Sequence, residues 1–526
     1  MEDTSALELR RLQVQAELDS GRTHAERNKL GQFATPPSLA LDLLEYAYSL
    51  LPPATPVRFL DPAFGTGSFY SALLRTFEPS RIAWASGYEI DPYYGDRARE
   101  LYGGTGLHLH IADFTRVAFP GGEEDKANLL ICNPPYVRHH HLLASEKARL
   151  RYLVRRTAGM RLSGLAGFYC HYLGIAHAWM AEGGVAGWLI PSEFMDVNYG
   201  QAVKQYLLEH VTLLRIHRFD PSEVQFDDAL VSSAVVWFRK AAPPLAHTIE
   251  FTYGGTLAAP KVSTEVTTES LRRTPKWTSL PSSSSVNFIG RSQTRLSDLF
   301  TIRRGLVTGS NEFFIVTPQI IARYQIPEQF LKPILPSARY LRTDEIAADE
   351  AGNPVLAHRL FLLACDLPEA EVQARYPLLW QYLQQGVKAG VSQRYLCRHR
   401  TPWYRQEERR PALFLCTYMG RGTKGSRPLR FILNHSRAIA ANTYLMLYPK
   451  PNLARYLREN PNRLKQVWQA LSQIAPETLM GSGRVYGGGL HKIEPNELGN
   501  AAVGIISEIL VEPRAEQMVL FPSGQL

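Results

Sequence analysis

Residues 57–240 alternate short apolar runs with amphipathic segments of helical period. This alternation is typical of a doubly wound α/β sheet, in which helices connect neighbouring strands. Two segments predict helices, 69–77 and 168–181, and the glycine pair 183–184 would end the second one. The apolar runs predict seven strands, at residues 57–60, 83–89, 107–111, 129–132, 185–190, 213–219 and 231–238.

The texture of the chain changes after residue 240. Proline and glycine pairs and a serine-rich stretch follow, which favour a connection between domains. The last part is rich in Arg, Tyr, Pro and Gly, and its irregular period does not define a fold. We therefore predict a helical extension over 1–30, an α/β domain over 31–242, a linker over 243–290 and a second domain over 291–526.

Composition excludes several classes of protein. The chain has 526 residues, 45% of them hydrophobic and 20% charged, which is ordinary for globular domains and argues against disorder. No apolar run approaches the roughly 20 residues that span a bilayer, and the N-terminus lacks the basic-then-apolar order of a signal peptide. Five cysteines without a Cys-x-x-Cys pair disfavour a disulfide framework or a thiolate zinc site. We expect a soluble, cytoplasmic protein that does not bind membranes.

Charge is distributed unevenly along the chain. Residues 1–250 hold 24 Lys and Arg against 28 Asp and Glu, a net charge of −4, whereas residues 251–526 hold 34 against 21, a net charge of +13. Within 391–437 there are 11 basic residues and two acids. Such a segment is either a binding patch for a polyanion or a solvated basic surface.

The first chemical motif follows the first predicted strand. Asp61 stands at the carboxyl end of the strand, and the turn through Ala63, Gly65 and Gly67 leads into a helix. Open α/β sheets bind ligands at this edge, where glycine lets a cofactor approach the backbone. A dinucleotide is disfavoured, because Tyr70 occupies the position of the third glycine in Gly-x-Gly-x-x-Gly.

Two more predicted strands also end in acids. Glu89 is placed to accept hydrogen bonds from both ribose hydroxyls. Asp113 beside Phe114 suits an adenine ring, with the acid accepting from the exocyclic amine and the phenyl ring packing on the base. Together these acids favour a cofactor that contains adenosine. The alternative is that each acid caps the helix that follows its strand.

The fourth strand runs into the tetrapeptide Asn133-Pro134-Pro135-Tyr136. The prolines fix the backbone, so that the Asn133 side-chain oxygen and the Pro134 carbonyl can converge on one planar amine without a competing donor. Two acceptors that hold the amine hydrogens turn the nitrogen lone pair toward an electrophile, and Tyr136 offers a flat face for the ring that carries the amine. The alternative is a simple proline turn after a strand.

The three motifs occur in the order Gly31-Gln-Phe-Ala-Thr35-Pro-Pro37, then 61–69, then Asn133-Pro-Pro-Tyr136. As a set, covering residues 31 to about 240, they resemble the gamma-class, Taq-type DNA adenine-N6 methyltransferases of bacterial restriction-modification systems. This resemblance implies a mixed seven-stranded Rossmann-like domain that uses S-adenosylmethionine as methyl donor.

The resemblance also implies roles for individual residues. The stretch around Thr35 would lie over the methionine part of the cofactor, which the glycine turn would also hold. The acids would bind the cofactor's ribose and adenine, and the Asn133 tetrapeptide would grip a target adenine flipped out of the duplex. Phe226 matches the second aromatic of the target pocket, although a core position at a strand entry is the alternative. Phe64 stands where many relatives have Cys.

In the second half, the stretch 303–314 followed by 330–333 is similar to the start of the Taq-type target-recognition domain, which implies an α+β domain that binds double-stranded DNA. Basic residues interleaved with aromatic ones suit phosphate contacts and some base contacts. The histidines 139–141 would lie on the DNA face, and no metal site is expected. We expect DNA contacts from Arg303, Arg304, Arg398, Arg400, Arg405, Arg421 and Lys424.

Other functions remain open from the sequence. Asn-Pro-Pro-Tyr also occurs in enzymes that methylate glutamine in release factors or guanine in ribosomal RNA, and a decayed, non-catalytic nucleic-acid binder is a third possibility. A fused nuclease is not expected, because 30 residues precede Gly31 and no Pro-Asp dipeptide occurs. The family resemblance implies instead a monomer that protects host DNA from a separate cognate restriction endonuclease.

Overall fold

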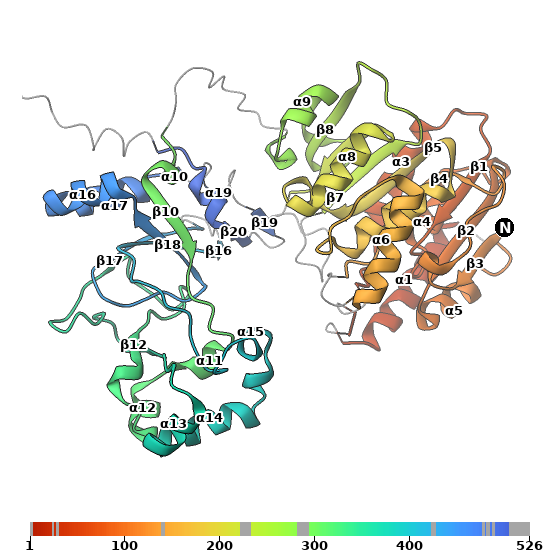
Figure 1. Cartoon of the computed structure of the whole chain (residues 1–526). Helices are drawn as coiled ribbons and strands as arrows, with labels where there is room; N and C mark the ends of the chain where they lie inside the picture. The colour runs from red at the N-terminus through yellow and green to blue at the C-terminus, as the bar shows by residue number, and fades with distance from the viewer. Residues whose placement is uncertain are drawn as a thin grey trace, which may run out of the picture. The chain divides into compact units, whose positions relative to one another are not determined.

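The computed structural model divides the chain into two units, the first comprising residues 1–287 with 486–488 and the second the remainder (Figure 1). Each unit is described by itself. The structure describes residues 4–23, 26–27, 31–137, 142–220, 233–280, 294–421, 428–475, 479, 484–486 and 490–503. Within these residues, no helix has both the length and the apolar character needed to cross a bilayer.

A nine-stranded mixed sheet forms the centre of the first unit, in the order β3-β2-β1-β4-β5-β7-β6-β8-β9. The strands β3-β2-β1-β4-β5 run parallel, β7 is antiparallel to both neighbours, β6 and β8 are parallel, and β9 is antiparallel to β8. The strands are β1 (Val57–Asp61), β2 (Ile82–Glu89), β3 (Leu107–Ile111), β4 (Ala127–Cys132), β5 (Met180–Pro191), β6 (Thr212–Arg218), β7 (Ser233–Arg239), β8 (Thr248–Gly255) and β9 (Pro260–Thr267).

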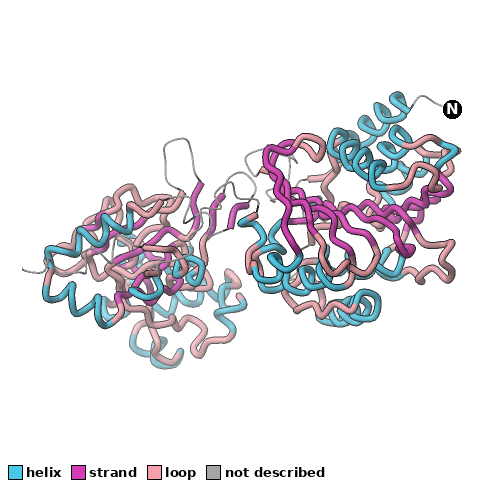
Figure 2. The backbone as a smooth tube through the Cα atoms, turned by 90° about the horizontal axis from the view of Figure 1, so that it is seen from above, coloured by secondary structure: helices cyan, strands magenta, loops and turns pink. Residues whose placement is uncertain are grey.

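Helices cover both faces of this sheet (Figure 2), as a doubly wound fold requires. Successive strand side chains point to opposite faces, so Phe59 and Leu60 belong to two separate cores. One core is closed by α1 (Thr4–Ser20), α3 (Pro37–Leu50), α4 (Ser68–Thr76) and α5 (Pro92–Leu101). The other is closed by α6 (Ala144–Ala158), α7 (Phe168–Ala176), α8 (Gln201–Glu209) and α9 (Thr268–Arg273).

The seven predicted strands are present, but the prediction of a seven-stranded sheet was wrong because β8 and β9 extend it. Both strands and α9 lie in the stretch 243–290 that we interpreted as a linker. β8 pairs with β6 and buries Ile249 and Phe251 completely. β9 is an edge strand with mostly exposed polar side chains, which is why its sequence suggested a linker.

The predicted helix end at Gly183 and Gly184 was also wrong. Helix α7 ends at Ala176, and both glycines lie inside β5. They take part in the sheet, since Gly183 N donates to Lys240 O and Lys240 N donates to Gly184 O, both at 2.8 Å. The two glycines therefore belong to a strand and do not end a helix. Gly183 has a positive φ of 75°.

The second unit combines one five-stranded sheet with two three-stranded sheets, in the orders β10-β18-β15-β17-β13, β11-β14-β12 and β16-β20-β19. Its strands are β10 (Phe300–Arg304), β11 (Ile315–Val316), β12 (Leu331–Pro333), β13 (Glu345–Ile346), β14 (Phe361–Leu363), β15 (Phe414–Thr417), β16 (Met419–Arg421), β17 (Phe431–Asn434), β18 (Tyr444–Pro449), β19 (Arg484–Tyr486) and β20 (Leu490–Lys492). Its helices are α10 (Leu296–Leu299), α11 (Asn311–Phe314), α12 (Pro318–Tyr324), α13 (Glu369–Arg375), α14 (Pro377–Lys388), α15 (Tyr395–Arg398), α16 (Pro451–Glu459), α17 (Leu464–Ser472) and α19 (Pro495–Gly499).

Candidate functional site: a cavity at the carboxyl ends of four strands

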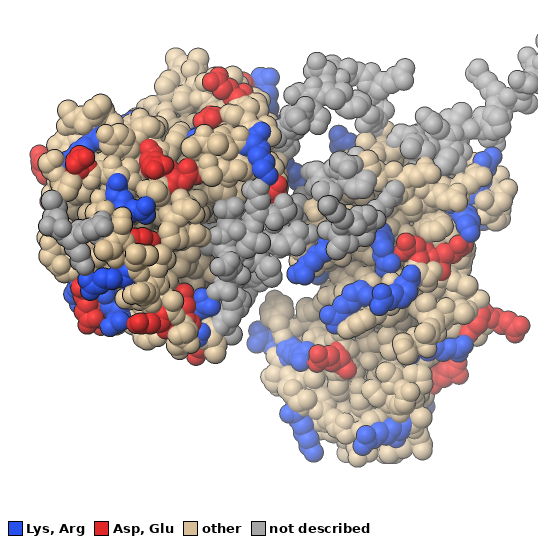
Figure 3. All heavy atoms as spheres, turned by 180° about the vertical axis from the view of Figure 1, so that it is seen from behind, with Lys and Arg blue, Asp and Glu red and all other residues tan. Residues whose placement is uncertain are grey.

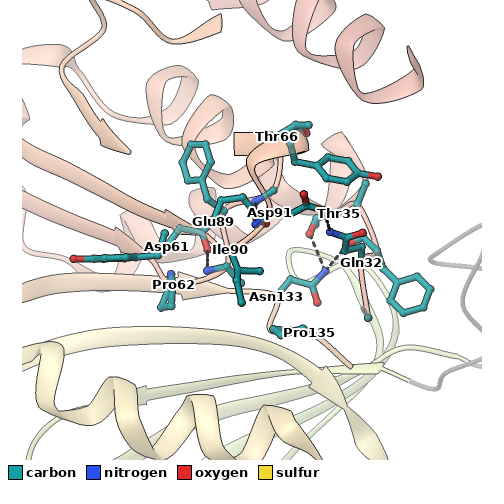
Figure 4. Close-up of a pocket in the computed structure, with 18 of the residues that line it drawn as sticks. Gln32, Thr35, Asp61, Pro62, Thr66, Glu89, Ile90, Asp91, Asn133 and Pro135 are labelled. Atoms are coloured by element: carbon teal, nitrogen blue, oxygen red, sulfur yellow. Dashed lines mark hydrogen bonds between the residues drawn. The ribbon is translucent and has the colours of Figure 1, made fainter. Parts of the chain in front are cut away.

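A cavity of about 670 Å³ lies at the carboxyl ends of β1, β2, β3 and β4. The polar residue that ends or follows each strand borders it: Asp61, Glu89, Asp113 and Asn133. Figure 4 shows Asp61, Glu89 and Asn133 at the cavity. Successive members of this set are 20 to 28 positions apart in sequence, and the parallel arrangement of the strands brings all four to one edge. The size is that of an ordinary small-molecule site.

The glycine turn after β1 forms one wall of the cavity. A Cβ built on Gly65 would meet nothing within 4 Å, so the backbone there faces open space. Gly67 does not border the cavity; its φ of 81° begins helix α4, and a Cβ would lie 2.6 Å from the ring of Tyr102. Ala63 and Phe64 also border the cavity. The turn therefore offers a ligand direct access to the backbone at Gly65.

Glu89 is buried at the cavity and tied to the glycine turn. Its two carboxylate oxygens accept from Gly65 N and Asp91 N, each at 2.8 Å. Burial raises the pKa of Glu89, against the effect of these two amide donors. The backbone amide of Ile90 also lowers the pKa of Glu89, and the four lone-pair sites of a carboxylate leave room to accept from a ribose hydroxyl. The site thus fits the adenosine-bearing cofactor that the sequence predicts.

Asp61 has a strongly perturbed carboxyl group. Its Oδ1 accepts from Ala63 N at 3.1 Å, and its side chain is buried beside the cavity. Burial raises the pKa of Asp61 to about 8, and the nearby negative charge of Glu89 adds to this shift. A buried acid of this kind is stabilised in its charged form by a cation. The positively charged sulfur of S-adenosylmethionine would meet that requirement.

Asp113 borders the cavity and also caps a helix. Its Oδ1 accepts from Thr115 N at 2.9 Å, and its Oδ2 accepts from Arg116 Nε at 3.2 Å. Phe114, by contrast, is 1% exposed and packs against the rings of neighbouring aromatic residues in the core. This corrects the expectation that Phe114 packs on a ligand, because the turn after β3 directs its side chain toward the sheet. The aromatic residues that border the cavity are Phe33, Phe64, Phe69, Tyr88, Tyr94, Phe168 and Tyr172.

Asn133 lies at the rim of the cavity with its amide group held in one orientation. Its Nδ2 donates to the carbonyl of Phe33 and to Oγ1 of Thr35, both at 3.1 Å (Figure 4). Thr35 also borders the cavity and is 6% exposed. Both amide hydrogens are therefore used, and Oδ1 is the part of the side chain left to accept a hydrogen bond.

The rest of the tetrapeptide lies around this amide. Pro135 borders the cavity, while Pro134 is buried and does not. Tyr136 lies outside the cavity wall, where its hydroxyl donates to Leu189 O at 3.0 Å and so fixes the ring. Phe226, proposed as the second aromatic of a target pocket, is outside the described residues, as are the histidines 139–141.

The N-terminal helix α1 contributes to the site, which the sequence did not predict. Gln15, Asp19 and the following Arg22 border the cavity. Buried Arg11 forms an ion pair with Glu8 at 2.7 Å. Its guanidinium also donates to hydroxyls of the glycine turn, at 3.2 Å to Thr66 and 3.0 Å to Ser68. A charged pair three residues apart usually indicates an exposed helix face, so the sequence offered no signal for this role.

The residues that the sequence predicts to contact DNA lie in the second unit. Arg303, Arg304, Arg398, Arg405 and Arg421 are exposed, and Figure 3 shows several Lys and Arg side chains on the face of this unit that it draws.

Arg400 differs from the other predicted DNA contacts, and Lys424 is outside the described residues. Arg400 is half-buried, and it donates to the carbonyls of Val307 and Thr308 at 2.8 and 2.7 Å. The guanidinium of Arg400 therefore holds a loop of the protein in place.

Across the described ranges, no group of three or more His, Cys, Asp or Glu side chains is placed to hold a metal ion. All five cysteines are buried and unpaired with one another.

Two family models match the chain. Residues 100–226 match the Eco57I restriction-modification methylase, and residues 283–519 match the C-terminal domain of the type II methyltransferase M.Eco57I. The chain is similar to Eco57I-type restriction-modification methylases. The first match contains Asp113 and the Asn133 tetrapeptide, and the second contains the basic face of the second unit.

Full-length relatives extend this similarity. The chain is 26% identical over 477 residues to the type II methyltransferase M.XamI of Xanthomonas campestris pv. amaranthicola, covering 89% of this chain and 84% of the relative. It is 24% identical over 490 residues to M.AccI of Acinetobacter calcoaceticus, covering 90% and 85%.

A solved structure supports the fold. The Type IIL restriction-modification enzyme MmeI, determined in complex with DNA, aligns with a TM-score of 0.52 at 14% identity over 84% of this chain. The chain spans 66% of the length of MmeI, just under two thirds.

Proposed function

We propose that this protein transfers a methyl group from S-adenosylmethionine to N6 of adenine at a short recognition site in double-stranded DNA. The observation that carries the proposal is the Asn133 amide at the rim of the cavity. Its NH2 group is held by Phe33 and Thr35, and its oxygen is left as an acceptor. An acceptor fixed beside a cofactor cavity suits an amine substrate and does not suit a carbonyl or phosphate.

The residues of the chain would bind the cofactor as follows. Glu89 would accept from the ribose hydroxyls, Gly65 would allow the ligand to approach the backbone, and Asp61 would face its positive charge. Asp113 caps a helix through Oδ1, which accepts twice from Thr115, and Oδ2 accepts once from Arg116, so a lone pair of Oδ2 would be left for the adenine amine. When bound, S-adenosylmethionine supplies an electrophilic methyl group on a positively charged sulfur.

The target amine would be activated without a strong base. Asn133 Oδ1 and the Pro134 carbonyl would each accept one hydrogen of the amine, which draws the nitrogen lone pair out of conjugation with the ring. Tyr136, with its hydroxyl anchored to Leu189, would pack against the flipped base. The neutral Asn133 side chain donates nothing to the amine, because its two hydrogens are already engaged.

The second unit would bind the duplex. Its basic side chains suit phosphate contacts, and binding through them would weaken steeply as salt rises. The names of the relatives as type II methyltransferases support a role in restriction-modification, in which methylation protects host DNA from a separate cognate endonuclease. We propose that the chain acts as a monomer.

The test is methyl transfer from labelled S-adenosylmethionine to three substrates: genomic DNA, ribosomal RNA and release-factor protein. We expect N6-methyladenine in DNA only, at one short sequence, and no label with Asn133→Ala. Label in RNA guanine or in a protein glutamine would favour methylation of another planar amine. If Asn133→Ala labels DNA as fast as the wild type, the proposed role of the amide is wrong.

A further inference from the structure

The orientation of the Asn133 amide is decided by a segment about one hundred residues earlier in the chain. The carbonyl of Phe33 can only accept a hydrogen bond, so the NH2 group of Asn133 must face it. A reversed amide would place Oδ1 of Asn133 against that carbonyl oxygen, two acceptors in contact. Among the residues that the structure describes, Oδ1 of Asn133 accepts no hydrogen bond, so it is available to a substrate amine.

The segment that holds the amide is itself fixed. Gly31, with φ of 67°, approaches so closely that a Cβ would lie 2.5 Å from Tyr136 N. The ring of Phe33 lies 5.9 Å from the ring of Tyr136, centroid to centroid. Gln32 Nε2 donates to Asp91 at 3.0 Å. The segment 31–35 is therefore anchored both to the Asn133–Tyr136 tetrapeptide and to the turn after β2.

Thr35 provides the second acceptor, and its place in the chain makes it stiff. It is 6% exposed and precedes Pro36 and Pro37, where helix α3 begins. One acceptor alone would leave the amide free to twist about its terminal torsion, which is broad in Asn. Two acceptors define the plane of the amide and therefore the direction of Oδ1.

We propose that Thr35 is a positioning residue for Asn133: its buried hydroxyl oxygen holds the amide so that Oδ1 faces the target amine. This inference rests on the proposed function. It gives Thr35 a role that acts through Asn133, beyond any contact with the cofactor.

The first test separates these two roles by comparing Thr35→Val with Thr35→Ser. Valine keeps the shape but removes the acceptor, whereas serine keeps the acceptor. With both substrates saturating, we expect single-turnover methyl transfer to fall about ten-fold in Thr35→Val, the effect of about one hydrogen bond, and to stay within about two-fold in Thr35→Ser. The Kd for S-adenosylmethionine, measured by calorimetry, should change little. A raised Kd with an unchanged saturated rate would show that Thr35 serves the cofactor alone and would overturn the inference.

The second test measures how strongly the protein binds the target amine when no methyl transfer takes place. The DNA site is first mapped from the methylated DNA of expressing cells. Duplexes carrying adenine or unsubstituted purine at the target position are then bound in the presence of S-adenosylhomocysteine. Purine pairs more weakly than adenine in the duplex, and this difference contributes to the ratio of the two Kd values. The contribution is the same for every protein variant, so it cancels when the ratios of two variants are compared. We expect the preference for adenine to fall in Thr35→Val, to persist in Thr35→Ser, and to be lost in Asn133→Ala.

A double variant decides whether Thr35 acts through Asn133. Adding Thr35→Val to Asn133→Ala should leave the Kd for the adenine duplex unchanged, and a further rise in that Kd would contradict the inference. Thr35→Ala also lacks the acceptor. Assayed below its own melting temperature, it should show the same reduced preference for adenine as Thr35→Val. If the wild type methylates no DNA, the proposed function fails; if it does and Thr35→Val matches it, only the positioning role fails.

Discussion

Replacing Arg11 by Met tests how the N-terminal helix α1 supports the cofactor cavity. Arg11 is 1% exposed and donates twice to Glu8, at 2.7 and 2.8 Å. The same guanidinium reaches the hydroxyls of Thr66 and Ser68 in the glycine turn. The substitution therefore removes both an ion-pair partner and two donors to the turn.

The expected cost follows from the burial of the pair. The side chain of Glu8 is 10% exposed, so Arg11→Met leaves a carboxylate that is nearly cut off from water. Breaking a buried ion pair costs about 3–5 kcal/mol of unfolding free energy, and we expect the lower end because Ser71 and Arg75 also favour the charged form of Glu8. Replacing both partners with apolar residues, as in Glu8→Leu with Arg11→Met, removes that charge, and we expect stability within about 1–2 kcal/mol of the wild type.

The assay is urea unfolding, using the transition that S-adenosylmethionine shifts to higher denaturant, combined with calorimetry of cofactor binding. We expect the double variant to recover stability but not cofactor affinity, since Thr66 and Ser68 lose their donor in both variants. A double variant as unstable as Arg11→Met would refute the buried-charge argument. Unchanged cofactor affinity in both would show that α1 does not position the turn.

Three further predictions concern separate parts of the molecule. Gly31→Ala should slow methyl transfer far more than Gly104→Ala. Both glycines have a positive φ, but of the two only Gly31 lies so close to other backbone atoms that a Cβ would clash with them. Equal rates in the two variants would contradict this close approach. Burial raises the pKa of Asp61 to about 8, so the contribution of Asp61 to the free energy of unfolding falls as the pH rises toward 8. Because a cation favours the charged carboxylate, binding of S-adenosylmethionine at pH 7 should release a proton from Asp61. Calorimetry in two buffers of different ionisation enthalpy should detect that proton in the wild type and not in Asp61→Asn. Arg421→Ala should weaken binding to a duplex and lower by about 1 the slope of log binding constant against log salt concentration, without changing the melting temperature. Arg400→Ala should instead lower the melting temperature, because its guanidinium holds two loop carbonyls. The reverse pattern would exchange the roles of the two residues.

Much of the first unit could be predicted because its signals are local. A strand in a doubly wound sheet is a short apolar run, and the acid or amide at its end occupies the next positions in sequence, so Asp61, Glu89 and Asn133 could be placed at one edge from the order of the elements. Errors arose where a local signal has two meanings. Gly183 indicated a helix end but lies in β5, and the polar residues of β9 indicated a linker but form a sheet edge.

The sequence alone determined the order of strands and motifs, the residue types at the strand ends, and the concentration of positive charge in the second half. The tertiary structure decided which distant groups meet. Thr35 holds the amide of Asn133 across 98 positions, and Arg11 reaches Thr66 across 55. The physical reason is that periodicity and turn chemistry act over a few residues, whereas such hydrogen bonds depend on how the packed helices and the sheet bring separate segments within about 3 Å.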